Sequence, residues 1–125
     1  QDILNEITDY FAEKTERLKQ MGLKDMVIDP GFGFSKAIDQ NFELLGLVNN
    51  FKIFGFPILA GLSRKSMIYK TLNISPGEAL NGTTVLNTIA LMQGINILRV
   101  HDVREARETI QLYEKYSAFL QTDKS

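Results

Sequence analysis

The sequence predicts an α/β fold in which short parallel strands alternate with helices. Three brief apolar runs, each ended by turn residues, have the length of buried strands, and amphipathic helical patterns separate them. The strand ends follow one another at roughly 30 to 40 residues, which is the length of one βα unit. Because a parallel neighbour is reached only by a crossover, this order predicts right-handed βαβ connections and a parallel sheet.

The composition is that of an ordinary one-domain globular chain. It has 125 residues, of which 44% are hydrophobic and 23% charged, and its net charge is -1. Because it has no basic run, it lacks the positive charge expected of a protein that binds nucleic acid or an anionic membrane. The absence of cysteine excludes disulfides, thiolate zinc sites and thiol nucleophiles, and fits a cytoplasmic protein. No apolar run approaches about 18 residues, and the N-terminus lacks a signal-peptide pattern. The chain lacks an initiator Met and a helix begins almost at once, so we expect it to be cut from a longer protein.

The first helix and strand are predicted from the N-terminal third. Residues 3 to 21 form an amphipathic helix that Gly22 closes. Its apolar stripe consists of Ile3, Ile7, Phe11 and Leu18. The run Met26-Val27-Ile28 then predicts a buried strand that stops at Asp29-Pro30-Gly31.

The middle of the chain predicts a helix, a strand and an interrupted helix. The helix runs from about residue 39 to 51, with Phe42, Leu45 and Val48 on one side, and the strand is 58 to 61. The next helix begins after Ser63, breaks at Asn73-Ile74 and restarts at Ser75, where Ser75 and Glu78 have the spacing of a capping box.

The last strand and helix follow Gly94. Residues 95 to 101 form the third predicted strand, and Asp102 is expected to cap the final helix. The apolar face of that helix consists of Val103, Ala106, Ile110, Tyr113 and Leu120.

Three strands are too few for a complete barrel or doubly wound sheet, so we interpret the chain as the last part of a (βα)8 barrel. Its polar residues support this: Asp29, residues 63 to 66 and the pair Arg99 and His101 follow the C-terminal ends of the strands, where βα barrels build active sites. A small open sheet stays an alternative, because open sheets bind ligands at the same end.

Two groups of cations indicate anion binding. Arg99 and His101 are two residues apart on one predicted strand, so we expect their side chains to share a face with Ile95 and Ile97. The pair forms either a clamp for phosphate or carboxylate or merely two solvated residues at the end of the sheet. Lys65 and Ser66 stand at a helix N-terminus, where acidic residues are the usual choice. They form either an anion site or a solvated first turn.

Asp29 has two interpretations. It caps its turn, or it recognises a planar N–H array such as a 2-amino-pyrimidinone through two parallel hydrogen bonds. The glycines of this loop allow a flat ligand to approach closely. Phe32 and Phe34 either pack on the barrel or stack near that ligand.

Three segments resemble the C-terminal signatures of dihydropteroate synthase, the sulfonamide target family. They are "DPGFGFSK" at 29 to 36, "GLSRKS" at 61 to 66 and "ILRVHDV" at 97 to 103, and "NGTTVLNTIALMQG" is similar to the family's seventh helix. The resemblance covers residues 1–125 and implies the C-terminal portion of a pterin-binding (βα)8 barrel. It implies a transferase that condenses 6-hydroxymethyl-7,8-dihydropterin pyrophosphate with para-aminobenzoate, giving 7,8-dihydropteroate and pyrophosphate in folate biosynthesis.

The resemblance also implies roles for single residues. Asp29 hydrogen-bonds the pterin, Phe34 borders the pocket, and Lys65 bonds the pterin close to the reacting centre. Ser35 stands where the family often has glycine, which we expect to stiffen the loop around Phe34.

By the same resemblance, Ser66 receives the aminobenzoate carboxylate. Arg99 stacks over the pterin and, with His101, holds the diphosphate. Gly61 belongs to the substrate-binding set, and Lys65, Arg99 and His101 form the catalytic set.

The remaining expectations concern partners and completeness. The family's Mg2+ is held through residues outside this chain, with no metal ligand within it, and a homodimer forms through the helices at 78 to 93 and 103 to 120. Alone, the chain is expected to be inactive. Two alternatives remain: a non-catalytic half-barrel acting in oligomerisation or small-anion binding, and a pterin-binding methyltransferase barrel, which the SRKS and RVHD segments do not support.

Overall fold

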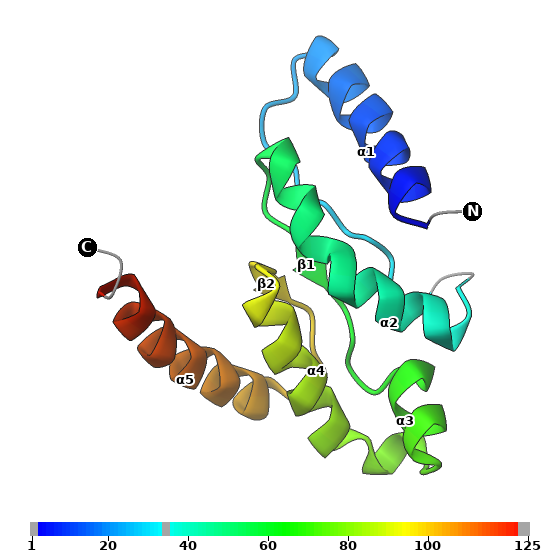
Figure 1. Ribbon diagram of the computed structural model, residues 1–125, viewed down its shortest axis with the longest axis vertical. Helices are drawn as coiled ribbons and strands as arrows, with labels where there is room; N and C mark the ends of the chain where they lie inside the picture. The colour runs from blue at the N-terminus through cyan, green and yellow to red at the C-terminus, as the bar shows by residue number, and fades with distance from the viewer. Residues whose placement is uncertain (1–2, 34–35, 123–125) are drawn as a thin grey trace.

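A computed structural model describes residues 3–33 and 36–122, with side chains described through residue 120. Its helices follow one another around a small parallel sheet (Figure 1). In chain order the elements are α1 (Ile3–Gln20), α2 (Ile38–Leu47), η1 (Val48–Phe54), β1 (Leu59–Ala60), α3 (Ser66–Leu72), η2 (Pro76–Glu78), α4 (Leu80–Met92), β2 (Ile97–Leu98) and α5 (Val103–Thr122). None of the helices in the described ranges is long and apolar enough to cross a membrane.

The sheet consists of three adjacent extended segments. β1 and β2 pair in parallel, with Leu59 opposite Ile97 and Ala60 opposite Leu98. On the other side of β1 there is only an isolated parallel bridge between Ile28 and Ile58 among the described residues. The order of the segments agrees with the predicted parallel arrangement.

The prediction of a buried strand at 26 to 28 is wrong except for Ile28. Its N–H donates to the carbonyl of Pro57, and its carbonyl accepts from the N–H of Leu59. The next bonds of a parallel ladder would need N–H groups from Pro57 and Pro30, and proline has none. Val27 is consequently outside the ladder and 52% exposed.

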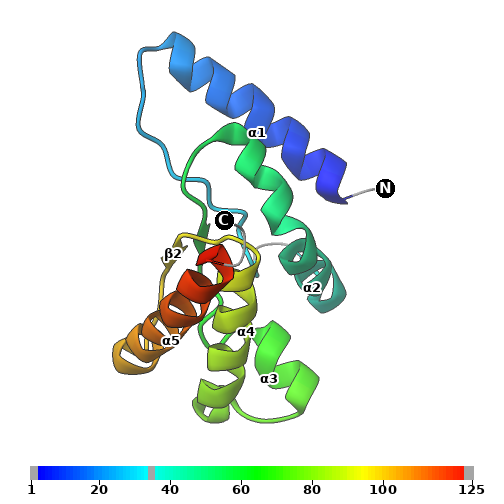
Figure 2. The same ribbon diagram turned by 60° about the vertical axis from the view of Figure 1, so that its left-hand side comes forward.

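The helices pack in chain order. Contacts connect α1 with α2, α2 with α3, α3 with α4 and α4 with α5. Figures 1 and 2 both show α5 beside α4 at one end of this arc and α1 beyond α2 at the other. A barrel built from βα units has this kind of outer helical layer.

Several helix boundaries confirm the predicted signals. Gly22 has φ 91° after α1, and Asn73 has φ 57° after α3, so both residues end a helix in the left-handed conformation. The N–H of Ser75 donates to the Glu78 carboxylate at 3.1 Å, as expected of a capping box. The predicted helix at 39 to 51 ends as α-helix at Leu47 and continues as the 3-10 helix η1.

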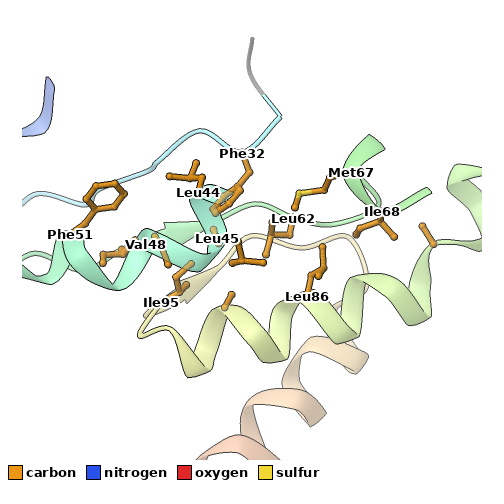
Figure 3. Close-up of a cluster of buried hydrophobic side chains, with 14 residues drawn as sticks. Phe32, Leu44, Leu45, Val48, Phe51, Leu62, Met67, Ile68, Leu86 and Ile95 are labelled. Atoms are coloured by element: carbon orange, nitrogen blue, oxygen red, sulfur yellow. The ribbon is translucent and has the colours of Figure 1, made fainter. Parts of the chain in front are cut away.

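One hydrophobic cluster fills the space between the helices and the sheet (Figure 3). Leu44, Leu45 and Val48 meet Met67 and Ile68 of α3 there. Its other members come from the loop after Ile28, from η1, from β1, β2 and the residues around them, and from α4 and the residue before it: Phe32, Phe51, Ile58, Ala60, Leu62, Ala79, Leu86, Ala90 and Ile95. Phe32 is therefore a core residue, the first of its two predicted placements.

The predicted apolar face of the last helix is only partly correct. Ala106 is buried, whereas Val103 and Leu120 are 59% and 44% exposed. Among the described elements, α5 makes substantial contacts with α4 alone. One narrow apolar stripe along α5 is therefore enough to form this contact. Phe42 was predicted to share one side of its helix with Leu45 and Val48; it is 37% exposed, whereas Leu45 and Val48 are buried.

Candidate functional site

Three loops that follow the extended segments meet at one end of the sheet. They contain residues 29–33, 61–66 and 99–102. Parallel pairing brings the carboxyl ends of neighbouring strands to the same edge, so the loops are adjacent although they are far apart in the sequence. The predicted site residues that the structure describes lie on these loops or at the first residue of α3.

Asp29 uses its two carboxylate oxygens differently. One accepts from the N–H of Gly31 at 2.9 Å, which confirms the turn-capping interpretation. The other lies 3.4 Å from an Arg99 guanidinium nitrogen, and the two side chains are 38% and 54% exposed. This is long for a charge-assisted bond, which is typically about 2.7–2.9 Å. The second oxygen is thus weakly held and faces the site.

Arg99 lies directly over Gly61. A Cβ atom on Gly61 would come within 2.4 Å of an Arg99 terminal nitrogen and 2.9 Å of the central guanidinium carbon. Real contacts are not that short, so only glycine permits this position. The first residue of the GLSRKS segment thus has a steric reason to be glycine.

Lys65 reaches across to the first loop. Its ammonium donates to the carbonyl of Phe32 at 2.6 Å. Burial lowers the pKa of Lys65, nearby Arg99 lowers it further, Asp29 opposes this, and Lys36 adds to the lowering. Lys65 is therefore not the solvated first-turn residue of the alternative interpretation.

Lys36 is a cation of the site that was not among the predicted site residues. Its ammonium donates to the carbonyls of Gly31 at 2.8 Å and Pro30 at 3.3 Å. Burial lowers its pKa, and Asp29 partly compensates. The sequence did offer a signal for Lys36, because this residue ends the DPGFGFSK segment.

Asn41 of α2 is a second residue that the sequence did not reveal. It is 1% exposed, and its side-chain oxygen accepts from the N–H of Gly33 at 2.8 Å. Its amide donates to the carbonyl of Ala37 at 3.1 Å. Asn41 thus holds the loop of the first segment on the helix beneath it; an isolated Asn in an amphipathic helix gives no such signal.

His101 lies against Ser63. The Ser63 hydroxyl oxygen is 3.2 Å from the His101 backbone nitrogen and 3.1 Å from the ring Nδ1. The hydroxyl can either donate to Nδ1 or accept from it, since its oxygen has a second lone pair besides the one that accepts the backbone N–H.

The predicted third strand is too long. β2 ends at Leu98, so Arg99 and His101 lie beyond it, and the backbone N–H of His101 is bonded to a side chain. The expected common face with Ile95 and Ile97 is not observed either. Ile95 is buried in the core, and Ile97 is 37% exposed.

Ser66 is the first residue of α3 and is half-buried, with Lys65 at the N-cap position. Phe34 and Ser35 lie outside the described residues. Within residues 3–33 and 36–122, no group of three or more His, Asp or Glu side chains is placed to hold a metal ion.

The charges favour an anionic ligand with an N–H-rich part. Three cationic side chains, those of Lys36, Lys65 and Arg99, surround the carboxylate of Asp29. Such a set neutralises phosphate or carboxylate, while the second oxygen of Asp29 accepts N–H donors.

Comparison with known proteins agrees with this chemistry. The pterin binding enzyme family matches residues 1–101. Dihydropteroate synthase of Escherichia coli K12 is 43% identical over 115 residues, covering 90% of this chain but 41% of that protein. The chain therefore spans less than half of the length of such relatives.

Solved structures give the same result. Dihydropteroate synthase of Yersinia pestis superposes with a TM-score of 0.91 at 36% identity, covering 94% of this chain and 49% of that one. The Thermus thermophilus enzyme in complex with 6HMPPP gives a TM-score of 0.86 at 34% identity, covering 92% of this chain and 46% of the other. These neighbours are (βα)8 barrels, and the chain has the fold of part of one.

Proposed function

The chain belongs to the pterin binding enzyme family, and we propose that it supplies part of the active site of a dihydropteroate synthase. The reaction would condense 6-hydroxymethyl-7,8-dihydropterin pyrophosphate with para-aminobenzoate to 7,8-dihydropteroate and pyrophosphate. The observation that carries the proposal is the meeting of Asp29, Lys65 and Arg99 at one end of the sheet. Residues 1–125 would form the C-terminal portion of the pterin-binding barrel.

In this proposal Asp29 recognises the pterin. Its second oxygen would accept the ring's N–H groups in place of the 3.4 Å contact with Arg99. An exposed ion pair of this kind is worth only about 0–1 kcal/mol, so the exchange costs little. Arg99 would then stack on the pterin ring, in the space beside Gly61 that is free because glycine has no side chain. Phe34 would border the pocket.

The cations would act on the leaving group. The bond between the pterin methylene carbon and the diphosphate oxygen breaks, its electron pair leaves with pyrophosphate, and the amine nitrogen bonds to the carbon and then releases a proton. Arg99 and His101 would stabilise the negative charge that develops, and Lys65 would bond the pterin beside this centre. An aniline nitrogen has a free lone pair at pH 7, so orientation matters more than general base catalysis. Ser66 would bind the aminobenzoate carboxylate.

The family resemblance also implies Mg2+, held through residues outside this chain. The described residues form no carboxylate or imidazole cluster for it, and no step above depends on the ion. When bound, the metal would neutralise diphosphate charge.

The whole protein would be a cytoplasmic homodimer without nucleic-acid or membrane partners. Apolar side chains on α4 and α5 support the dimer: Val85, Ile89, Met92, Leu112, Tyr116 and Phe119 are all at least 39% exposed. The same surface favours the second candidate, a half-barrel that acts in oligomerisation. Sedimentation of a Phe119→Glu variant would test this surface, since a dimer that persists unchanged would exclude it.

A chimera tests the function directly. This chain would replace the segment that it matches in the E. coli enzyme, and formation of dihydropteroate would be measured. We expect an active chimera, loss of at least about 100-fold in kcat/KM for Lys65→Ala, and no change for the exposed control Arg17→Ala. A folded but inactive chimera, or an active Lys65→Ala variant, would contradict the proposal. The 125-residue chain by itself is expected to be inactive.

A further inference from the structure

Arg64 has an unusual backbone conformation that its surroundings hold in place. Its φ is 54°, in the left-handed region, which is unfavourable for a residue with a side chain. Its backbone N–H donates to the hydroxyl of Thr83 at 3.0 Å. Its guanidinium makes two 3.0 Å bonds to the Asp102 carboxylate and donates to the carbonyls of Pro76 and Gly77. Strain of this kind persists only where several contacts determine it.

These contacts extend the pairing of β1 and β2 beyond the strands. Paired residues of the two strands, such as Leu59 and Ile97, are 38 apart in the sequence. The same separation recurs where Ser63 contacts His101 and where Arg64 bonds Asp102. Side chains thus continue the parallel register into the loops after the backbone ladder has ended.

Arg64 is also the point at which the second loop turns. The residue before it, Ser63, contacts His101 on the third loop. The residue after it, Lys65, donates to the carbonyl of Phe32 on the first loop. The left-handed conformation of Arg64 directs these two neighbours toward different partners.

We propose that Arg64, through its paired bonds with Asp102, is a positioning residue that sets the locations of Lys65 and His101 together. The inference deepens the proposed function and rests on it only for the chemistry that these two cations perform. Arg64 itself touches no substrate in this proposal. Its side chain is 26% exposed and that of Asp102 is 23% exposed, so solvent competes less for this pair than for surface pairs.

Other arginines of the chain provide matched controls. Arg17 and Arg104 are 62% and 81% exposed, and each pairs with a glutamate on its own helix. Arginines this exposed gain little stability from their ion pairs, and each of these two pairs lies within a single helix. Arg64 differs because it ties the second loop to η2 and to the start of α5.

The experiment follows Lys65 and His101 by NMR in this chain. Arg64→Lys keeps the charge but loses the planar fork that makes paired bonds. Asp102→Asn keeps the size and is the second variant should the first not fold; Arg104→Lys is the control. The ring signals of His101 are unambiguous because the sequence has a single histidine, and a Lys65→Arg variant assigns the Lys65 side chain.

We expect both site variants to release Lys65 toward solvent and so to raise its titration midpoint, because burial is what lowers its pKa most. The same variants should shift the His101 ring signals. The control should move neither. Urea unfolding would record stability separately. Folded site variants that lose stability but leave both signals unchanged would overturn the proposal, since Arg64 would then only stabilise the fold. These signals require no catalysis, so failure of the chimera would refute the proposed function without deciding this inference.

Discussion

Adding one methyl group at Gly61 should separate the stability of the fold from the function of the site. In Gly61→Ala the new Cβ would lie 2.4 Å from an Arg99 nitrogen, whereas ordinary contacts begin at 3.4 Å. The guanidinium must therefore retreat by about 1 Å. Because Arg99 is 54% exposed, its side chain can move without disturbing the core.

The two consequences differ in size. Gly61 is not among the glycines with positive φ, so alanine restricts the unfolded chain and stabilises the fold by about 0.4–1 kcal/mol. Loss of the exposed pair between Arg99 and Asp29 costs about 0–1 kcal/mol, and the two effects nearly cancel. In the site, by contrast, a displacement of about 1 Å can cost on the order of 100-fold in rate.

Urea unfolding of the chain and kcat/KM of the chimera measure the two effects. Gly46→Ala in α2 is the matched control, since nothing lies within 4 Å of its new Cβ. It should stabilise the helix by about 1 kcal/mol and leave activity unchanged. Wild-type kcat/KM in the Gly61→Ala chimera would refute the close packing of Arg99 as a functional requirement.

Three further predictions concern residues that support the site. Asn41→Leu should lower the free energy of unfolding by about 1–3 kcal/mol, because a loop N–H loses its buried acceptor; unchanged urea midpoints would contradict this. The pKa of Asp102 is held below its ordinary 3.8 mainly by its hydrogen bond to Arg64, so the stability it adds above pH 3.8 is lost as the pH falls further. Asp102→Asn should therefore be less stable at neutral pH and less sensitive to acid, and melting curves parallel to the wild type would argue against it. Ser63→Ala should change the balance of the His101 ring tautomers, because Nδ1 loses its hydrogen-bond partner, and identical 15N shifts in the ring would disprove the hydroxyl's role.

Local signals explain why the order of elements was predictable. Gly22, Asn73 and the capping box at Ser75 mark helix boundaries through the chemistry of a few neighbouring residues. The placement of Asp29 and Lys65 at one end of the sheet was predictable too, because parallel strands align their carboxyl ends. The lengths of the strands were harder to predict. Pro30 and Pro57 shorten the ladder because they lack N–H groups, but this can be recognised only when their pairing partners are known.

The sequence by itself determined the helical periodicity, the parallel alternation and which residues carry charge at the strand ends, all of which depend on short-range patterns. Only the tertiary structure decided that Arg99 lies on Gly61, that Asn41 holds the first loop, and that Arg64 bonds Asp102. Each of these contacts joins residues from different segments. Its existence depends on how the chain packs in space, where a distance of about one or two ångströms decides whether two groups bond or clash.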